Sequence, residues 1–171
     1  MTVRPAAMIE EELAERLKGA RRLAVVGIGD ELHRADRFGI LAAKGIEALR
    51  LPGVRVFLAG TTPESFTAPI RRYRPDHVLL LDAADMGAEP GTVGIIAPGA
   101  VSGTRLSTHA LPLSVVIEYI ERTAKARVTL VGFQPDFRTA AIGPTPAEQE
   151  GLARLVGAVR AAAERAGTPR P

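Results

Sequence analysis

The segment RRLAVVGIGDELHRADRFG, residues 21–39, predicts a strand, a loop and the approach to a helix. Its apolar run, Leu23–Val26, has the length of a buried strand, two glycines follow, and a helical pattern then runs over Ile40–Leu49. Asp36 stands between the strand and the helix. Because ligands of open parallel sheets bind outside the carboxyl ends of the strands, Asp36 is the first candidate for a functional side chain.

Length and composition indicate one globular domain. The chain has 171 residues, of which 46% are hydrophobic and 24% charged, and we expect residues 1–171 to form a single domain with an extra helix in 1–20 and a frayed tail at 167–171. The net charge of +3 is a modest excess of arginine, and aromatic residues make up only 4%, so nucleic-acid binding is not favoured. Cysteine is absent, which excludes disulfides and thiolate ligands.

Targeting signals are not apparent in the sequence. The amino-terminal 20 residues carry acidic side chains within a helical pattern and have no long apolar centre, which is unlike a signal peptide. No run approaches the roughly 18 apolar residues that a membrane span needs. These features predict a cytoplasmic protein.

Short apolar runs alternate with amphipathic stretches along the whole chain. This order predicts an α/β fold with three layers, a mostly parallel twisted sheet of about five strands and helices on both faces. The expected strands are 23–26, 54–59, 77–81, 92–96 (an edge strand) and 127–131, and the expected helices are 7–19, 40–49, 64–73, 113–125 and 146–166.

Three residues with side chains suited to catalysis or metal binding fall at strand ends or in loops. Asp36 follows the first strand, Asp82 directly follows the third, and His109 precedes a helix. Two carboxylates and an imidazole suit zinc, nickel or iron and leave positions open for a substrate group or water. Each residue also has a structural interpretation: Asp36 or Asp82 could cap a helix or stabilise a turn, and His109 could hydrogen-bond within its loop.

The other histidines and the glycines point to less specific roles. His77 enters a strand, and His33 has Arg34 and Arg37 as neighbours, which disfavour a cation. The pair Gly27-Ile28-Gly29 resembles the start of a dinucleotide fingerprint, but Leu32 occupies the place of its third glycine. A tight turn is the structural alternative for these glycines.

Four motifs, in this order, resemble the hydrogenase maturation endopeptidases over about residues 23–155. They are Gly27-Ile28-Gly29-Asp30-Glu31-Leu32 leading to Asp36 and Gly39, then Leu80-Leu81-Asp82-Ala83-Ala84-Asp85-Met86-Gly87, then Ser107-Thr108-His109-Ala110-Leu111-Pro112-Leu113, and Gly132-Phe133-Gln134-Pro135. The Asp-Met-Gly and Gly-Phe-Gln-Pro elements are most similar to the branch that serves hydrogenase 3 of the formate hydrogenlyase type.

The resemblance implies an endopeptidase of aspartic type by family classification. Such enzymes remove a carboxyl-terminal extension from the precursor of a [NiFe] hydrogenase large subunit once nickel is in place. The catalytic and metal-contacting positions of the family fall on Asp36, Asp82 and His109. The implied metal is nickel supplied by the precursor, the implied partner is that precursor, and a monomer is expected. Either the metal or a carboxylate acting as general base would activate the water.

This chain departs from the family pattern around Asp36. Asp30 replaces the usual asparagine, Ala35 replaces the first of two acidic residues, and Arg37 replaces a frequent glycine. Asp30 adds a negative charge near the expected site. Two other functions remain open: a nickel-binding maturation chaperone that does not cut, and a dinucleotide-dependent oxidoreductase.

Overall fold

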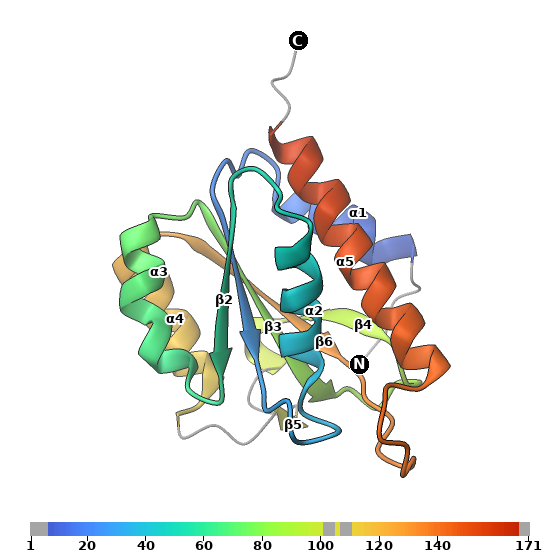
Figure 1. The fold of residues 1–171 in the computed structure, drawn as a ribbon. Coiled ribbons are helices and arrows are strands. Elements are labelled where there is room, and N and C mark those ends of the chain that lie inside the picture. The colour runs from blue at the N-terminus through green and yellow to red at the C-terminus, as the bar shows by residue number, and fades with distance from the viewer. Residues whose placement is uncertain (1–6, 101–104, 107–110, 168–171) are drawn as a thin grey trace.

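The computed structural model describes residues 7–100, 105–106 and 111–167, which form a mostly parallel sheet covered by helices on both faces (Figure 1). Its main strands follow the order β2-β1-β3-β6-β4, and a two-residue strand, β5, pairs with the end of β3. The strands are β1 (Leu23–Ile28), β2 (Val54–Gly60), β3 (His77–Asp85), β4 (Val93–Ile96), β5 (Arg105–Leu106) and β6 (Arg127–Phe133). The α-helices are α1 (Ala7–Arg16), α2 (Phe38–Ala48), α3 (Thr67–Tyr73), α4 (Leu113–Ala124) and α5 (Pro146–Gly167), with short 3-10 helices at Pro63–Phe66 and Pro98–Ala100.

The helices divide the core into two apolar layers, one on each face of the sheet. On one face α1, α2 and α5 pack over the sheet, with Leu13, Ile46 and Leu155 among the buried residues. On the other face α3 and α4 contribute Ile70 and Ile120. Figure 1 shows α3 and α4 together on one side of the strands and α1 with α5 on the other. The expected three-layer α/β fold is therefore confirmed.

Strand pairing agrees with the predicted, mostly parallel sheet. Strands β1, β2, β3 and β6 are parallel, and β4 is antiparallel to β6 at the edge of the sheet. All six residues of β1 are buried, as expected of a strand covered on both faces. The edge position predicted for residues 92–96 is confirmed.

Strands β1, β2, β3 and β6 all end later than the sequence predicted, and two differences are the most informative. Strand β3 continues to Asp85, because its last two residues pair with β5, a partner far along the chain. Helix α2 begins at Phe38 rather than Ile40, and Phe38 is fully buried with its ring stacked on Phe133 at 4.5 Å between centroids. Both extensions depend on tertiary contacts that the local pattern does not contain.

Gly39, in the first turn of α2, allows this helix to lie directly on the sheet. A Cβ at this position would collide with the backbone oxygens of Ile28 and Leu81. Gly39→Ala should therefore lower the free energy of unfolding by about 1–3 kcal/mol, as overpacking usually does. Gly157→Ala is the matched control, since a Cβ at Gly157 in α5 meets nothing within 4 Å, and should stabilise by up to about 1 kcal/mol. Urea titrations of both variants test this difference.

None of the helices within the described ranges is long and apolar enough to cross a bilayer.

Candidate functional site

The order of the strands creates a switch point between β1 and β3. The chain leaves β1 through α2 on one face to reach β2, and leaves β2 through α3 on the opposite face to reach β3. Strands β1 and β3 are nevertheless neighbours in the sheet. Where connections diverge to opposite faces, a crevice opens at the carboxyl ends of the strands, and ligands bind there.

Asp36 lies at this crevice, in the loop between β1 and α2. Its Oδ2 accepts a hydrogen bond of 3.0 Å from the backbone N–H of Asp30, which closes the loop on itself. Gly29 is required beneath the loop, because a Cβ there would collide with the backbone oxygen of Asp36. The N-cap of α2 is Arg37, with no side-chain capping bond, so the capping interpretation of Asp36 is wrong.

The carboxylate of Asp30, the extra negative charge in this chain, bonds to other residues of its own loop. The Asp30 carboxylate accepts from the N–H of Leu32 at 2.9 Å and contacts Nδ1 of His33 at 2.9 Å. The hydrogen bond to His33 lowers the pKa of Asp30, and the same bond raises the pKa of His33. Asp30 therefore favours the imidazolium form of His33, while Arg34 bonds to Glu148.

Asp82 lies on the other side of the crevice. It lies within β3 rather than directly after the strand, where the sequence predicted it, and it is only 1% exposed. The pairing of β1 with β3 ends at Gly27 and Leu81, which places Asp82 immediately beyond the last paired residue. The first turn of α2 touches the carbonyl of Leu81, in the peptide bond to Asp82. The structure thus brings the segments that carry Asp36 and Asp82 to the same end of the sheet.

His109, the third predicted ligand, lies outside the described residues. Helix α4 begins at the carboxyl end of the sheet, because it returns the chain to the amino end, where β6 starts. Among the residues that are described, no three histidine, aspartate or glutamate side chains gather as a metal site. The predicted set of Asp36, Asp82 and His109 therefore stays a prediction.

Gln134 and Asp85 serve the local structure. The Oε1 of Gln134 accepts from the N–H groups of Met86 and Ala88 at 2.7 and 3.3 Å, and its Nε2 donates to Asp85 Oδ1 at 3.5 Å. Asp85 also accepts from the N–H of Gly87 at 3.3 Å, as a turn residue does. Because Gln134 is buried and its amide bonds within the chain, its side chain supports the local structure and is not presented to a substrate peptide.

An ion pair that the sequence analysis missed joins the Asp36 loop to the segment after β6. Glu148 is fully buried and accepts from Arg34 Nη2 at 2.6 Å and from Nη1 at 3.2 Å. Its carboxylate also accepts from the N–H groups of Asp136 and Thr145, each at 2.7 Å. Burial raises the pKa of Glu148, but these hydrogen bonds outweigh burial and hold the pKa below its usual value. Glu148 is thus an ionised, buried residue at the start of α5 that binds the Asp36 loop through Arg34.

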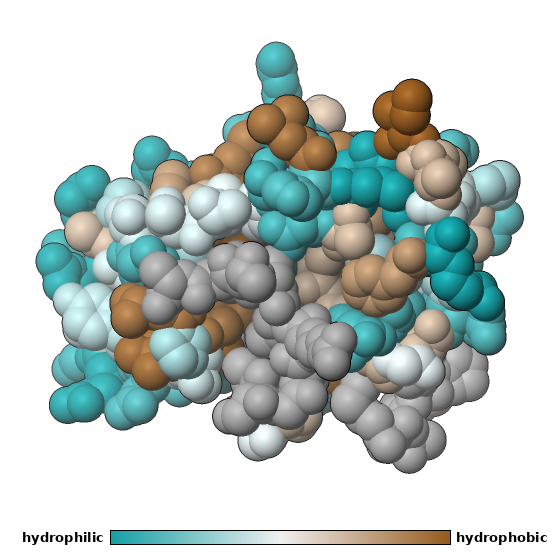
Figure 2. All heavy atoms as spheres, turned by 90° about the horizontal axis from the view of Figure 1, so that it is seen from below, coloured by the Kyte–Doolittle hydropathy of each residue, from teal (hydrophilic) through white to brown (hydrophobic). Residues whose placement is uncertain are grey.

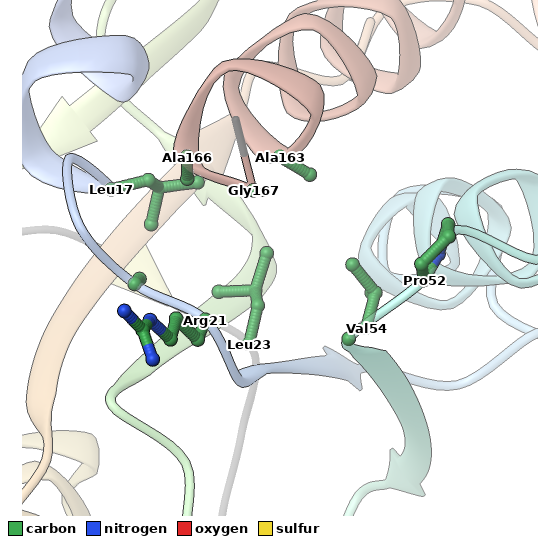
Figure 3. Close-up of a pocket in the computed structure, with 10 residues that line it drawn as sticks. Leu17, Arg21, Leu23, Pro52, Val54, Ala163, Ala166 and Gly167 are labelled. Carbon is green, nitrogen blue, oxygen red and sulfur yellow. The ribbon is translucent and has the colours of Figure 1, made fainter. Parts of the chain in front are cut away.

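A hollow of about 390 Å³ lies beside the Asp36 loop and opens widely to solvent. It is lined by Gly29, Asp30, Glu31, Ile40, Leu58, Gly60 and Thr61. A second pocket lies at the opposite, amino-terminal end of the sheet, between Leu17, Leu23 and α5 (Figure 3). Its volume of about 20 Å³ admits roughly one water molecule, so this second pocket is too small for a substrate.

The glycines after β1 pack the chain's own backbone. A Cβ at Gly27 would lie 2.6 Å from Cβ of Ala43, so this glycine allows α2 to approach β1 closely. At Gly29 the backbone of Asp36 occupies the space that a Cβ would need. Gly27 therefore serves the close packing of α2 on β1 rather than a tight turn, whereas Gly29, with a φ of 128°, lies at the bend that follows β1. The chain's own packing explains both glycines without a bound dinucleotide.

The fold and the site together define a class of protein. It is a three-layer α/β protein whose candidate functional residues, Asp36 and Asp82, are acidic and lie at the switch point of the sheet. The HycI family profile, described as hydrogenase maturation protease, matches residues 41–161. The chain belongs to the hydrogenase maturation proteases.

Individual relatives agree with this assignment. A candidate hydrogenase maturation protease of Methanocaldococcus jannaschii is 32% identical over 135 residues, which are 74% of this chain and 80% of that protein. Hydrogenase 3 maturation protease of Escherichia coli K12 is 32% identical over 110 residues, 64% of this chain and 70% of that protein. The crystal structure of HycI from Thermococcus kodakarensis superposes with a TM-score of 0.79 at 30% identity, covering 90% of this chain and 99% of the other. The predicted family is confirmed, and with it an enzyme that hydrolyses peptide bonds.

Proposed function

We propose that this protease removes the carboxyl-terminal extension from a nickel-loaded precursor of a [NiFe] hydrogenase large subunit. The family assignment supports a precursor as substrate. The observation that carries the proposal is the placement of Asp36 in the loop after β1 and of Asp82 in β3, the two strands that flank the switch point. A precursor tail that enters the crevice would approach the segments that carry both carboxylates.

The donors at the crevice fit a nickel ion that the precursor brings. The two carboxylates offer a charge of −2 to a dication, and an imidazole from His109 would complete a set of oxygen and nitrogen donors that nickel accepts. Asp36 uses Oδ2 for the bond from Asp30, which orients its carboxylate and fixes it in the loop. The proposed role of Asp36, Asp82 and His109 is to contact the precursor's nickel and hold the bond to be cut beside a carboxylate able to accept a proton from water.

The test is a trimming assay on a hydrogenase precursor from the same source as the chain. The purified protein is incubated with the nickel-loaded precursor, with the nickel-free precursor and with a precursor that lacks its extension, and product masses are measured. We expect one new, shorter product from the nickel-loaded form only. Nickel transfer to the precursor without any shortening would show a chaperone instead, and equal trimming of both full-length forms would refute recognition through nickel.

A further inference from the structure

Three strongly exposed apolar side chains lie on two loops at the carboxyl end of the sheet. Leu32 is 94% exposed and precedes Asp36 in the loop after β1. Ile142 and Phe137 are 92% and 57% exposed and lie between β6 and α5. Within the described ranges these are the three most exposed large apolar residues. Single exposed apolar residues are ordinary, but a group of them indicates a contact surface.

Arg34 joins the two loops, so the three side chains lie on adjoining segments. Its Nε donates to the backbone oxygen of Ala141 and its Nη1 to that of Asp136, both at 2.9 Å. These acceptors immediately precede Ile142 and Phe137, and Leu32 is two positions before Arg34. We call Leu32, Phe137 and Ile142 the apolar platform. Figure 2 views this end of the molecule and shows apolar atoms exposed among hydrophilic ones.

The loops beneath the platform are fixed before any partner binds. The guanidinium of Arg34 that holds Asp136 and Ala141 is itself held by buried Glu148. The backbone N–H of Thr145 donates to the Glu148 carboxylate at 2.7 Å, and the backbone N–H of Glu148 donates to the Thr145 hydroxyl at 3.3 Å. This reciprocal pair caps the start of α5. A surface that needs no ordering keeps more of its contact energy on binding.

The platform is continuous with the proposed processing site. Leu32 lies in the loop that the bond between Asp30 and Asp36 closes, and the same loop lines the open hollow through Gly29 and Glu31. A protein chain that brings its tail to Asp36 must therefore lie over or beside Leu32. A broad hollow next to an apolar surface fits the body of a protein better than it fits a small ligand.

We propose that the apolar platform docks the folded body of the precursor, while the crevice at Asp36 and Asp82 receives its tail. This inference rests on the proposed function. The complementary surface on the precursor is apolar and lies near the base of its extension. Docking by the body would align the tail with the crevice before the bond is cut, so the platform contributes to substrate affinity and not to the chemical step.

The double variant Leu32→Ser/Ile142→Ser tests the platform without disturbing the fold, because both side chains are almost fully exposed. For the nickel-loaded precursor we expect KM to rise about tenfold and kcat to stay within about twofold, as loss of apolar contact residues predicts. The dissociation constant for the precursor lacking its extension, measured by calorimetry, should rise by the same factor. Leu49→Ser is the control for loss of an apolar side chain away from the platform, since Leu49 is 37% exposed and directly follows the last residue of α2.

Each other outcome overturns the inference. The platform does not dock the body if the double variant keeps the wild-type KM, if only kcat falls, or if the wild-type protein does not bind the form without an extension. A dimer that becomes monomeric in the double variant would assign the platform to a second copy of this chain. The binding measurement needs no cleavage, so absence of trimming by the wild type would refute the proposed function and leave the docking result independent.

Discussion

Asp36→Asn and Asp82→Asn should each lower the rate of precursor trimming by about 10²–10⁴-fold, the range that a positioned acid or base contributes. Both changes keep the shape of the side chain and remove its charge. An asparagine oxygen at position 36 can still accept the N–H of Asp30, which is 3.0 Å away in the structure, so the loop should keep its conformation. The measurement is single-turnover trimming of the nickel-loaded precursor, with product mass as the readout.

Asp85→Asn provides a matched control within the same strand. Asp85 lies three residues beyond Asp82, and its Oδ1 accepts from Gly87 and Gln134, which an amide oxygen can also do. We expect this variant to trim at close to the wild-type rate. Full activity of Asp36→Asn or Asp82→Asn would contradict the assignment of that residue. Equal losses in all three variants would show a general effect of charge at this end of the sheet.

The fold could be predicted because its main signals are local. Strand β1 is an unbroken apolar run, and glycine and proline punctuate the turns that follow β1 and precede β2. The ends of elements were less accurate where a distant segment determines them. The last two residues of β3 are in a strand only because β5 pairs with them, and the start of α2 depends on the stacking of Phe38 against Phe133.

The site was predicted in part for the same reason. Asp36 and Asp82 follow apolar runs, and parallel strands bring their carboxyl ends to one edge, so their placement followed from topology. The ion pair between Arg34 and Glu148 joins residues 114 positions apart, which periodicity cannot reveal. One local signal was available: Thr145 followed three residues later by Glu148 is a capping-box pattern, and it identifies the start of α5.

A second large effect is expected from His77, at the end of the sheet opposite the proposed site. Its Nε2 lies 2.8 Å from Thr129 Oγ1, its Nδ1 has no hydrogen-bond partner among the described residues, and the side chain is buried. Burial, helped by the nearby charges of Arg127 and Arg16, lowers the pKa of His77 from 6.5 to about 4. The folded protein therefore keeps this imidazole neutral at pH values where the unfolded chain would protonate it.

The sign of the pH dependence follows from proton binding. Above about pH 6.5 His77 is neutral in both states, and its contribution to stability is constant. Between about pH 6.5 and pH 4 the unfolded chain binds a proton that the folded protein does not, so the free energy of unfolding falls as the pH falls. The full interval corresponds to a loss of up to about 3 kcal/mol. The carboxylates add their own acid dependence, which a variant of His77 shares.

His77→Gln isolates this contribution, because glutamine can hydrogen-bond Thr129 but does not titrate. We expect the variant to lose less stability than the wild type between pH 7 and pH 4, with the two urea-unfolding curves converging or crossing as the pH falls. Parallel pH dependences of the two proteins would contradict a neutral buried His77. His33→Gln is the control of opposite sign: Asp30 raises the pKa of His33, so any stability that His33 contributes is present in acid and lost as the pH rises through its folded-state pKa.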